Sequence, residues 1–225
     1  MKNRYFIITS LQSWDIEIGS TIKNTALELS KQNRVLYINP PMDFATRLRA
    51  LFHRKDSVSP AFKRRMEVLR GDADPIRTIN HNLWVVDCPF VLLSVSKLPA
   101  WLFDTFNRRN NRKIGRLIVK EAVTLGFKNY IHLIDTDIFR SRYLKEFIRP
   151  AVSVYYRRTD VLRTPYWQKY GRRVEQVVIQ QSDVMIVAAK SDIEQFRPYN
   201  SNIHLSHVDA NTGICNDIYS SIASI

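Results

Sequence analysis

The chain has 225 residues, of which 34 are Lys or Arg and 21 are Asp or Glu, so its formal net charge is +13 at pH 7. With 45% hydrophobic and 11% aromatic residues, a chain of this length can bury a full core, which excludes a wholly disordered protein and a coiled coil. The two cysteines, Cys88 and Cys215, are too few for a disulfide framework or a cysteine zinc site, and they fit a reduced cytoplasmic setting.

Glycine spacing and the length of apolar stretches argue against two common phosphate-binding motifs, a membrane span and a signal peptide. The six glycines have neither the spacing of a Walker A loop nor that of a G-x-G-x-x-G fingerprint. The most apolar stretch, Leu83 to Val95, is interrupted by Asp87 and Pro89 and is too short to span a bilayer. The first residues have no apolar core long enough for a signal peptide. We therefore expect a cytoplasmic globular protein.

Apolar runs alternate with amphipathic segments along the chain. The predicted strands are Tyr5–Thr9, Val35–Ile38, Leu83–Val86, Tyr130–Ile134, Ala151–Tyr156 and Val184–Val187. The predicted helices lie between Ser20 and Asn33 and at about 97–125, 138–148, 164–181 and 191–196. Apolar strands separated by helices predict an α/β fold in which helices cover both faces of a parallel sheet.

Two stretches depart from this alternation. Residues 43–77 form a long insertion with apolar side chains at helical spacing, and its part from 43 to 70 has eight Lys or Arg against three acids. Basic amphipathic helices of this kind can lie on an anionic membrane surface, although solvated helices packed on the core are the more frequent case. A second basic cluster follows at 108–120. Residues 201–225 contain one possible strand, Ile203–Leu205, but otherwise have little periodicity and are expected to be irregular.

Candidate site residues follow the predicted strands, because ligands of such sheets bind at the carboxyl ends of the strands. Asp135-Thr136-Asp137 has the D-x-D spacing with which two carboxylates can share a divalent metal, but a cap of the next helix is the more frequent use. Arg157 and Arg158 end another strand, where guanidinium groups suit phosphate or carboxylate. Surface pairing with Asp160 explains the two arginines equally well.

The loop after the first strand offers a further group. Gly19, with Ser20 behind it, would let an anion approach the amides at a helix N-terminus. Asp15 and Glu17 in the same loop could accept sugar hydroxyls or act as a base, although such residues are more often simply solvated. His132 lies on a predicted buried strand, so we expect a hydrogen-bonded core histidine there.

Five segments together resemble the N-terminal half of a family-4 type glycosyltransferase of the GT-B architecture, close to bacterial cell-surface polysaccharide enzymes. These segments are Trp14–Ser20, Asn24–Pro41, Asp135–Arg140, Val154–Arg158 and Ser182–Ser191. The resemblance implies a Rossmann-like, acceptor-side domain over residues 1–200 with a basic helical insertion. It also implies a donor-binding C-terminal domain that this chain does not contain. Many relatives carry a histidine where this chain has Asp135-Thr136-Asp137.

The same resemblance implies transfer of a hexose from a nucleotide diphosphate sugar to a glycan or lipid-linked acceptor in cell-surface polysaccharide synthesis, with the single domain inactive alone. Gly19 and Ser20 would lie beside the donor diphosphate, and Asp15 and Asp137 would be the catalytic residues. The acceptor side would be lined by three residues, Asp135, Arg157 and Arg158. The resemblance implies no metal and no cofactor besides the nucleotide sugar as co-substrate.

Two alternatives remain open from the residues alone. The first is a basic α/β binding module for anionic lipid or nucleic acid, motivated by the +13 charge. No motif of a nucleic-acid-binding domain is present, so we expect no nucleic-acid partner. The second is a small D-x-D transferase that uses Asp135 and Asp137 with a divalent metal. Either a cytoplasmic location or a peripheral one at the inner face of the cell membrane fits the charge.

Overall fold

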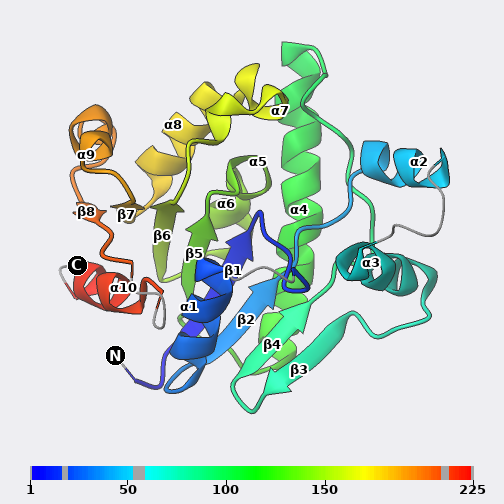
Figure 1. Ribbon diagram of the computed structural model, residues 1–225, viewed down its shortest axis with the longest axis horizontal. Helices are drawn as coiled ribbons and strands as arrows, with labels where there is room; N and C mark the ends of the chain where they lie inside the picture. The colour runs from blue at the N-terminus through cyan, green and yellow to red at the C-terminus, as the bar shows by residue number, and fades with distance from the viewer. Residues whose placement is uncertain (1, 17–19, 53–58, 209–212, 224–225) are drawn as a thin grey trace.

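The computed structural model describes residues 2–16, 20–52, 59–208 and 213–223 (Figure 1). Within these residues an eight-stranded sheet has the strand order β3-β4-β2-β1-β5-β6-β7-β8, in which β3 is antiparallel to β4 and every other neighbouring pair is parallel. The strands are β1 (Tyr5–Ser10), β2 (Arg34–Ile38), β3 (Ile76–Asn80), β4 (Leu83–Val86), β5 (Ile131–Asp135), β6 (Val152–Arg157), β7 (Val184–Val187) and β8 (Ile203–Leu205).

Helices cover both faces of this sheet (Figure 1). On one face lie α1 (Thr21–Ser30) and α10 (Cys215–Ile222). The opposite face is covered by α4 (Ala100–Thr124), α5 (Ile138–Ser141), α6 (Leu144–Ile148) and α8 (Gly171–Gln181). The remaining helical segments are α2 (Phe44–Phe52), α3 (Pro60–Arg70), η2 (Val161–Arg163), α7 (Pro165–Gln168) and α9 (Lys190–Phe196).

Burial on both faces explains why the strands are continuous apolar runs. Phe6 and Ile8 of β1 pack toward α1, whereas Ile7 between them packs toward α4, and all three are fully buried. Successive side chains of a strand point to opposite faces, so a strand covered on both sides needs apolar residues at every position. The predicted α/β fold with helices on both faces is therefore confirmed, and all six predicted strands are present.

Two predicted helices are each divided in the structure. The segment 138–148 breaks after Ser141, where the buried side chain of Asn111 donates to the Phe139 carbonyl and accepts from the Tyr143 amide, both at 2.9 Å. This side chain replaces hydrogen bonds that a continuous helix would make. The segment 164–181 breaks at Tyr170, and the Gly171 that follows lies so close to Leu162 that a Cβ there would be 2.5 Å from Leu162 Cδ2.

The expectation of an irregular tail over residues 201–225 was wrong for its last helix, whereas the possible strand at 203–205 is present. Residues 203–205 form β8 and residues 215–222 form α10, which packs on α1. Ile214, Cys215 and Ile218 are almost completely buried against that helix and the sheet. Three apolar residues at helical spacing were too short a signal, because the tertiary contact with α1 supplies the stability that this short helix lacks alone.

The insertion contains the two expected helices, α2 and α3, but it ends in a strand that the sequence did not predict. Ile76 and Arg77 begin β3, which pairs antiparallel with β4 at the edge of the sheet. Not all the basic side chains of the insertion are solvated, because Arg64 of α3 turns inward onto Asp87. Among the described helices, none combines the length and the apolar character that crossing a bilayer requires.

Candidate functional site

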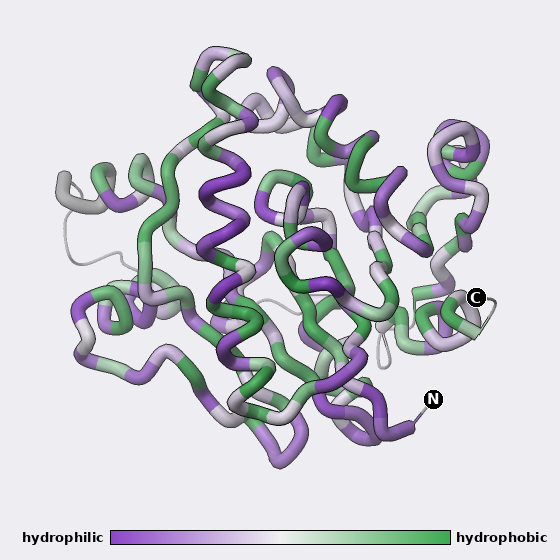
Figure 2. Tube along the Cα trace, turned by 180° about the vertical axis from the view of Figure 1, so that it is seen from behind, coloured by the Kyte–Doolittle hydropathy of each residue, from purple (hydrophilic) through white to green (hydrophobic). Residues whose placement is uncertain are grey.

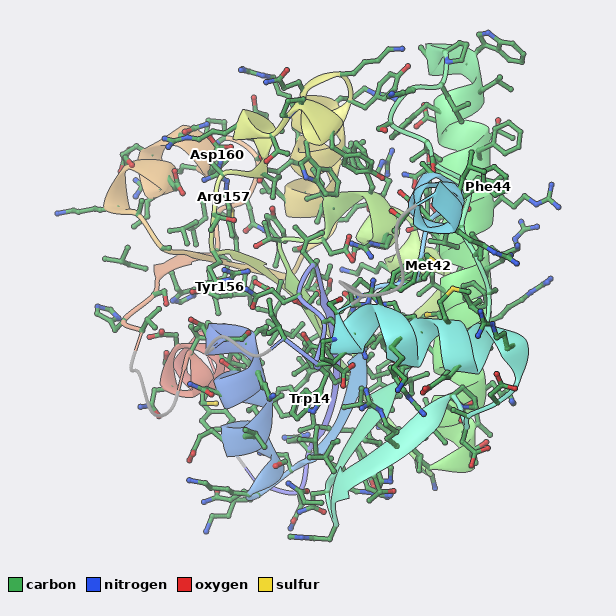
Figure 3. All side chains as sticks on the ribbon, turned by 45° about the vertical axis from the view of Figure 1, so that its right-hand side comes forward. Trp14, Met42, Phe44, Tyr156, Arg157 and Asp160 are labelled. Atoms are coloured by element: carbon green, nitrogen blue, oxygen red, sulfur yellow. The ribbon has the colours of Figure 1, made fainter. Side chains whose placement is uncertain are left out.

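The carboxyl ends of the parallel strands lie along one side of the sheet, which we call the carboxyl edge. Described residues line two hollows there. The first, the Arg157 pocket, has a volume of about 890 Å³ and is lined by residues that include Arg157, Arg158, Asp160, Glu175 and Asp192. The second, the Arg65 pocket, has about 230 Å³ and is lined by residues that include Met42, Arg65, Asn107, Arg140, Tyr166 and Trp167. In Figure 3, Met42 of the Arg65 pocket lies apart from Arg157 and Asp160 of the Arg157 pocket.

Asp15, predicted as catalytic, is held by a strand from the insertion. Arg77 of β3 donates Nη1 to Asp15 Oδ1 at 2.8 Å and Nη2 to Oδ2 at 3.0 Å. Behind this pair, Asp87 is nearly fully buried. Its carboxylate contacts Arg64 Nε at 3.1 Å and Arg77 Nε at 3.3 Å, and it accepts from the side-chain Nδ2 of Asn39 at 2.6 Å. These two carboxylates and two guanidinium groups form one neutral network over the ends of β2 and β4.

The network decides the protonation state of Asp15. Burial alone would raise the pKa of this carboxyl, but the hydrogen bonds and the charge of Arg77 outweigh it and lower the pKa below its usual 3.8. A carboxylate with a lowered pKa and a bidentate partner is a weak proton acceptor. The geometry therefore favours a role for Asp15 in holding the loop after β1 against β3.

Asp135 and Arg158, both predicted on the acceptor side, contact each other. Asp135 is fully buried at the end of β5, where its carboxylate accepts from Ser10 Oγ at 2.7 Å and from Arg158 Nε at 3.1 Å. Arg158 remains partly exposed and lines the Arg157 pocket. An anion in that pocket would meet Arg158 but not Asp135, which serves to orient the guanidinium.

Asp137 lies at the N-cap position of α5 without a side-chain capping bond. Its carboxylate instead accepts from Arg140 Nε at 2.9 Å, and the side chain is almost completely buried. Burial raises the pKa of Asp137, and the charge and hydrogen bonds of Arg140 offset this only in part. Thus the two acids of the D-x-D segment contact different arginines, and Thr136 between them has a positive φ of 58°. In the described residues, no group of three or more His, Cys, Asp or Glu has metal-binding geometry.

Arg157 is surrounded by acids. Its guanidinium contacts Glu175 Oε1 at 3.0 Å, Asp192 Oδ2 at 2.7 Å and Asp160 Oδ1 at 3.2 Å, and it lies 4.9 Å from the ring centre of Phe196. Burial and these acids act in opposite directions, and the acids prevail, so the pKa of Arg157 is raised. Arg157 thus fixes the wall of its pocket, with fewer donors left for a ligand than Arg158 has.

Ser20, expected beside a donor diphosphate, serves the start of α1. Its Oγ donates to Gln12 Oε1 and accepts from the Lys23 amide at 3.4 Å, and the residue is almost completely buried. The free amides of this helix N-terminus remain the groups that could meet an anion here. Gly19, the other residue of this prediction, lies outside the described residues.

Several partners of these residues were not singled out from the sequence. Arg77 belongs to the unpredicted strand β3, so nothing linked it to Asp15. Glu175 left a signal, because it lies on α8 beside Val174 and one turn before Val178 and Ile179, in the apolar stripe of the helix. An acid in such a stripe is rarely buried unless it is paired. Tyr155 Oη donates to it at 2.8 Å, and Arg157 supplies the charge.

The chain has the fold of a solved glycosyltransferase structure. It is similar to sucrose-phosphate synthase from Thermosynechococcus elongatus, a GT-B glycosyltransferase, with a TM-score of 0.55 and 9% sequence identity over 98% of this chain and 98% of the compared chain. No protein-family model and no curated protein sequence matches the chain. At this identity the likeness shows a shared fold, which is the Rossmann-like α/β fold expected from the sequence.

Proposed function

We propose that this chain is the acceptor-side domain of a family-4 type glycosyltransferase that moves a hexose from a nucleotide diphosphate sugar to a glycan or lipid-linked acceptor. The observation that carries the proposal is the fold shared with a GT-B glycosyltransferase over 98% of each chain. The two pockets at the carboxyl edge support it, since ligands of open α/β sheets bind there. A second, donor-binding domain, in the same or another chain, would complete the cleft.

Among the two acids predicted as catalytic, Asp137 suits a base better than Asp15. A general base works best when its pKa lies near the working pH, and burial raises the pKa of Asp137 whereas Arg77 lowers that of Asp15. In the proposed step the acceptor oxygen bonds to the anomeric carbon, the bond to the diphosphate breaks, and Asp137 takes the hydroxyl proton. Stabilisation of the leaving diphosphate would come from the donor domain.

The acceptor-side assignment can be tested by binding alone. Saturation-transfer NMR on the isolated chain should show signals from sugars and sugar phosphates, and much weaker signals from UDP, GDP and their hexose conjugates. Strong nucleotide signals without sugar signals would assign the chain to the donor side. Robust donor hydrolysis or transfer by the isolated chain would contradict the proposal that it is half of an enzyme.

The exposed face of α4 favours a second function, binding to an anionic membrane surface. Six cationic side chains lie exposed along this helix: Arg108, Arg109, Arg112, Lys113, Arg116 and Lys120. Figure 2 shows the strongly hydrophilic middle of α4 in purple. Trp101 is 76% exposed near one end of the helix and Val123 is 73% exposed near the other, as suits an interfacial segment.

Vesicle sedimentation tests this second function. The triple variant R109Q/R112Q/R116Q should lose binding to vesicles that contain phosphatidylserine, whereas vesicles of phosphatidylcholine should bind neither protein. A matched control, K31Q/R163Q/R197Q, removes three exposed cations from other surfaces, where their side chains are 68%, 86% and 66% exposed. Equal loss in both triple variants would attribute binding to net charge and not to the α4 face.

A further inference from the structure

We infer that the Arg65 pocket binds a phosphate or carboxylate group carried next to an apolar or sugar ring, because an unpaired guanidinium and an unpaired amide face aromatic side chains there. The identification of this ligand as the sugar acceptor rests on the proposed function. The anion site itself does not depend on that function, since it is inferred from the contacts of Arg65 and Asn107.

Arg65 is a cation without an ion-pair partner among the described residues. Its neighbour Arg64 pairs with Asp87, but Arg65 forms no ion pair with any residue that the structure describes, and its buried Nε has no hydrogen-bond partner there. Burial lowers the pKa of Arg65 and the positive charge of Arg140 lowers it further, while the charges of Asp87 and Asp15 offset this only in part. A largely buried guanidinium without an ion-pair partner is costly, so an anion that enters this pocket would reduce a standing penalty.

Asn107 supplies an independent observation. Its side chain is 1% exposed and lines the pocket from α4, and its Nδ2 has no partner in the described part of the chain. The other side-chain atom, Oδ1, already accepts from Asn111 Nδ2 at 3.2 Å, which orients the amide with its donor free. A buried donor without an acceptor is rare in folded proteins. In the described lining, both unsatisfied groups are therefore donors, and the one acid there, Asp43, already accepts from the Thr46 amide at 2.7 Å.

The walls indicate what carries the anion. Phe139 lies 4.3 Å from Trp167 and 5.7 Å from Tyr166 between ring centres, and all three line the pocket together with Met42. Aromatic faces suit the apolar face of a sugar or a ring. The volume of about 230 Å³ is below the ~300–1,000 Å³ of sites for drug-sized molecules, so the ligand part inside is small.

Position links this pocket to the proposed reaction. Leu11 follows β1, Pro40 follows β2 and Arg140 follows β5, and all three line the pocket, which places it on the carboxyl edge. Arg140 is also the partner of Asp137. An anionic acceptor held by Arg65 would therefore bind beside the ion pair that contains the proposed base.

Calorimetric titration of the full chain with three small probes tests the inference. Phenyl phosphate combines the anion with a ring, inorganic phosphate is the anion alone, and benzyl alcohol is a neutral ring. We expect phenyl phosphate to bind more tightly than inorganic phosphate and at least tenfold more tightly than benzyl alcohol. A charged hydrogen bond contributes ~1.5–3 kcal/mol, so Arg65→Gln should lower the affinity for phenyl phosphate about 10- to 150-fold.

Two further variants complete the design. Asn107→Asp keeps the acceptor for Asn111 but replaces the free donor with a negative charge. It should also lower the affinity for phenyl phosphate at least tenfold. Lys63→Gln removes an exposed cation from the same helix and should leave binding unchanged. Far-UV circular dichroism is the check that each variant is folded.

The outcomes separate this inference from the proposed function. Equal affinity of the Arg65→Gln and Lys63→Gln proteins, equal binding of the neutral and charged rings, or no binding of any phosphate would overturn the anion pocket. Tighter binding of inorganic phosphate than of phenyl phosphate would overturn the ring subsite. If phenyl phosphate binds through Arg65 while sugars and sugar phosphates give no NMR signal, the pocket stands and the acceptor-side function falls.

Discussion

Arg77 and Asp15 are 62 residues apart in the sequence, and both terminal nitrogens of Arg77 donate to the two carboxylate oxygens of Asp15, at 2.8 and 3.0 Å. Arg77 also contacts the buried Asp87 at 3.3 Å, so a single guanidinium joins the loop after β1 to the end of β4. The pKa of Asp15 is thereby held below its usual value. This arrangement makes Arg77 the residue on which the network depends.

Arg77→Ala should therefore destabilise the protein more than Asp15→Ala. Loss of Arg77 leaves Asp87 with Arg64 as its one cation and leaves Asp15 without a bidentate partner, which should cost about 2–4 kcal/mol of unfolding free energy. Urea denaturation at pH 7 measures the loss of unfolding free energy in both variants. Because the folded-state pKa of Asp15 lies below 3.8, the stabilisation is present above that pH and is lost as the pH falls further. A larger loss in Asp15→Ala would contradict this order.

A second prediction concerns the junction that docks α10 on α1. Gly213 has a φ of 62°, and a Cβ there would lie 2.2 Å from Thr25 Oγ1 and 3.0 Å from the Thr21 carbonyl oxygen. Gly213→Ala should displace α10 and cost ~2–4 kcal/mol, since the left-handed backbone and the overlap with α1 both act against it. Hydrogen exchange at the amides of α10 should speed up, because the helix loses its contact with α1.

Gly126 provides the matched control for this variant. It also has a positive φ, 69°, but a Cβ there would meet nothing within 4 Å. Gly126→Ala should therefore cost only the ~1–2 kcal/mol of the left-handed conformation and leave exchange in α10 unchanged. If the two glycine variants lose the same stability, contact with α1 does not limit substitution at residue 213.

The fold could be predicted from the sequence where burial on both faces of the sheet produced long apolar runs. Runs such as Tyr5–Thr9 and Val184–Val187 can be recognised without tertiary information, because every residue in them except the partly buried Tyr5 is buried whichever face it points to. Edge strand β3 has Thr78 and Ile79 exposed and polar residues among apolar ones, so it left no such run. Helix α10 was not predicted for another reason, since its stability comes from its contact with α1.

The candidate site was predictable only in part. The ends of the strands placed Asp135, Asp137, Arg157 and Arg158 on one edge, and all four lie there. Their partners depend on long-range packing that no local spacing encodes: Arg77 comes from an edge strand, and Arg65 points inward from a helix that looks basic and amphipathic. Charge alone suggested a solvated surface for the insertion, whereas Arg64 and Arg65 contribute to the interior of the edge.

The acids around Arg157 yield a third prediction. Arg157→Leu leaves Glu175 and Asp192 without their shared cation, and Glu175 is nearly fully buried, so the loss should reach about 3–5 kcal/mol. The control is Arg173→Leu, whose pair with Asp104 has side chains 54% and 39% exposed and should contribute under ~1 kcal/mol. Thermal and urea unfolding of both variants measure the difference. Similar losses would show that the buried cluster contributes no more than a surface pair.

His132 gives the fourth prediction, a pH dependence of stability. The side chain is fully buried on β5, where Nε2 lies 3.0 Å from Thr9 Oγ1 and no charged residue appears among its hydrogen-bond partners in the described chain. Burial lowers the pKa of His132 from 6.5 to about 3. Between these values the unfolded chain binds a proton that the folded protein does not, so stability must fall as the pH decreases below 6.5.

The size of this effect follows from the shift. Each pH unit below 6.5 costs up to ~1.4 kcal/mol, or about 2 kcal/mol at pH 5. His132→Gln removes the titrating group, so its unfolding free energy should decrease by about 2 kcal/mol less than that of the unsubstituted protein between pH 7 and pH 5. Urea denaturation at both pH values measures the two slopes, and His81→Gln, at an exposed turn, should behave like the unsubstituted protein. Equal slopes in the His132 variant and the unsubstituted protein would show that another group controls the acid sensitivity.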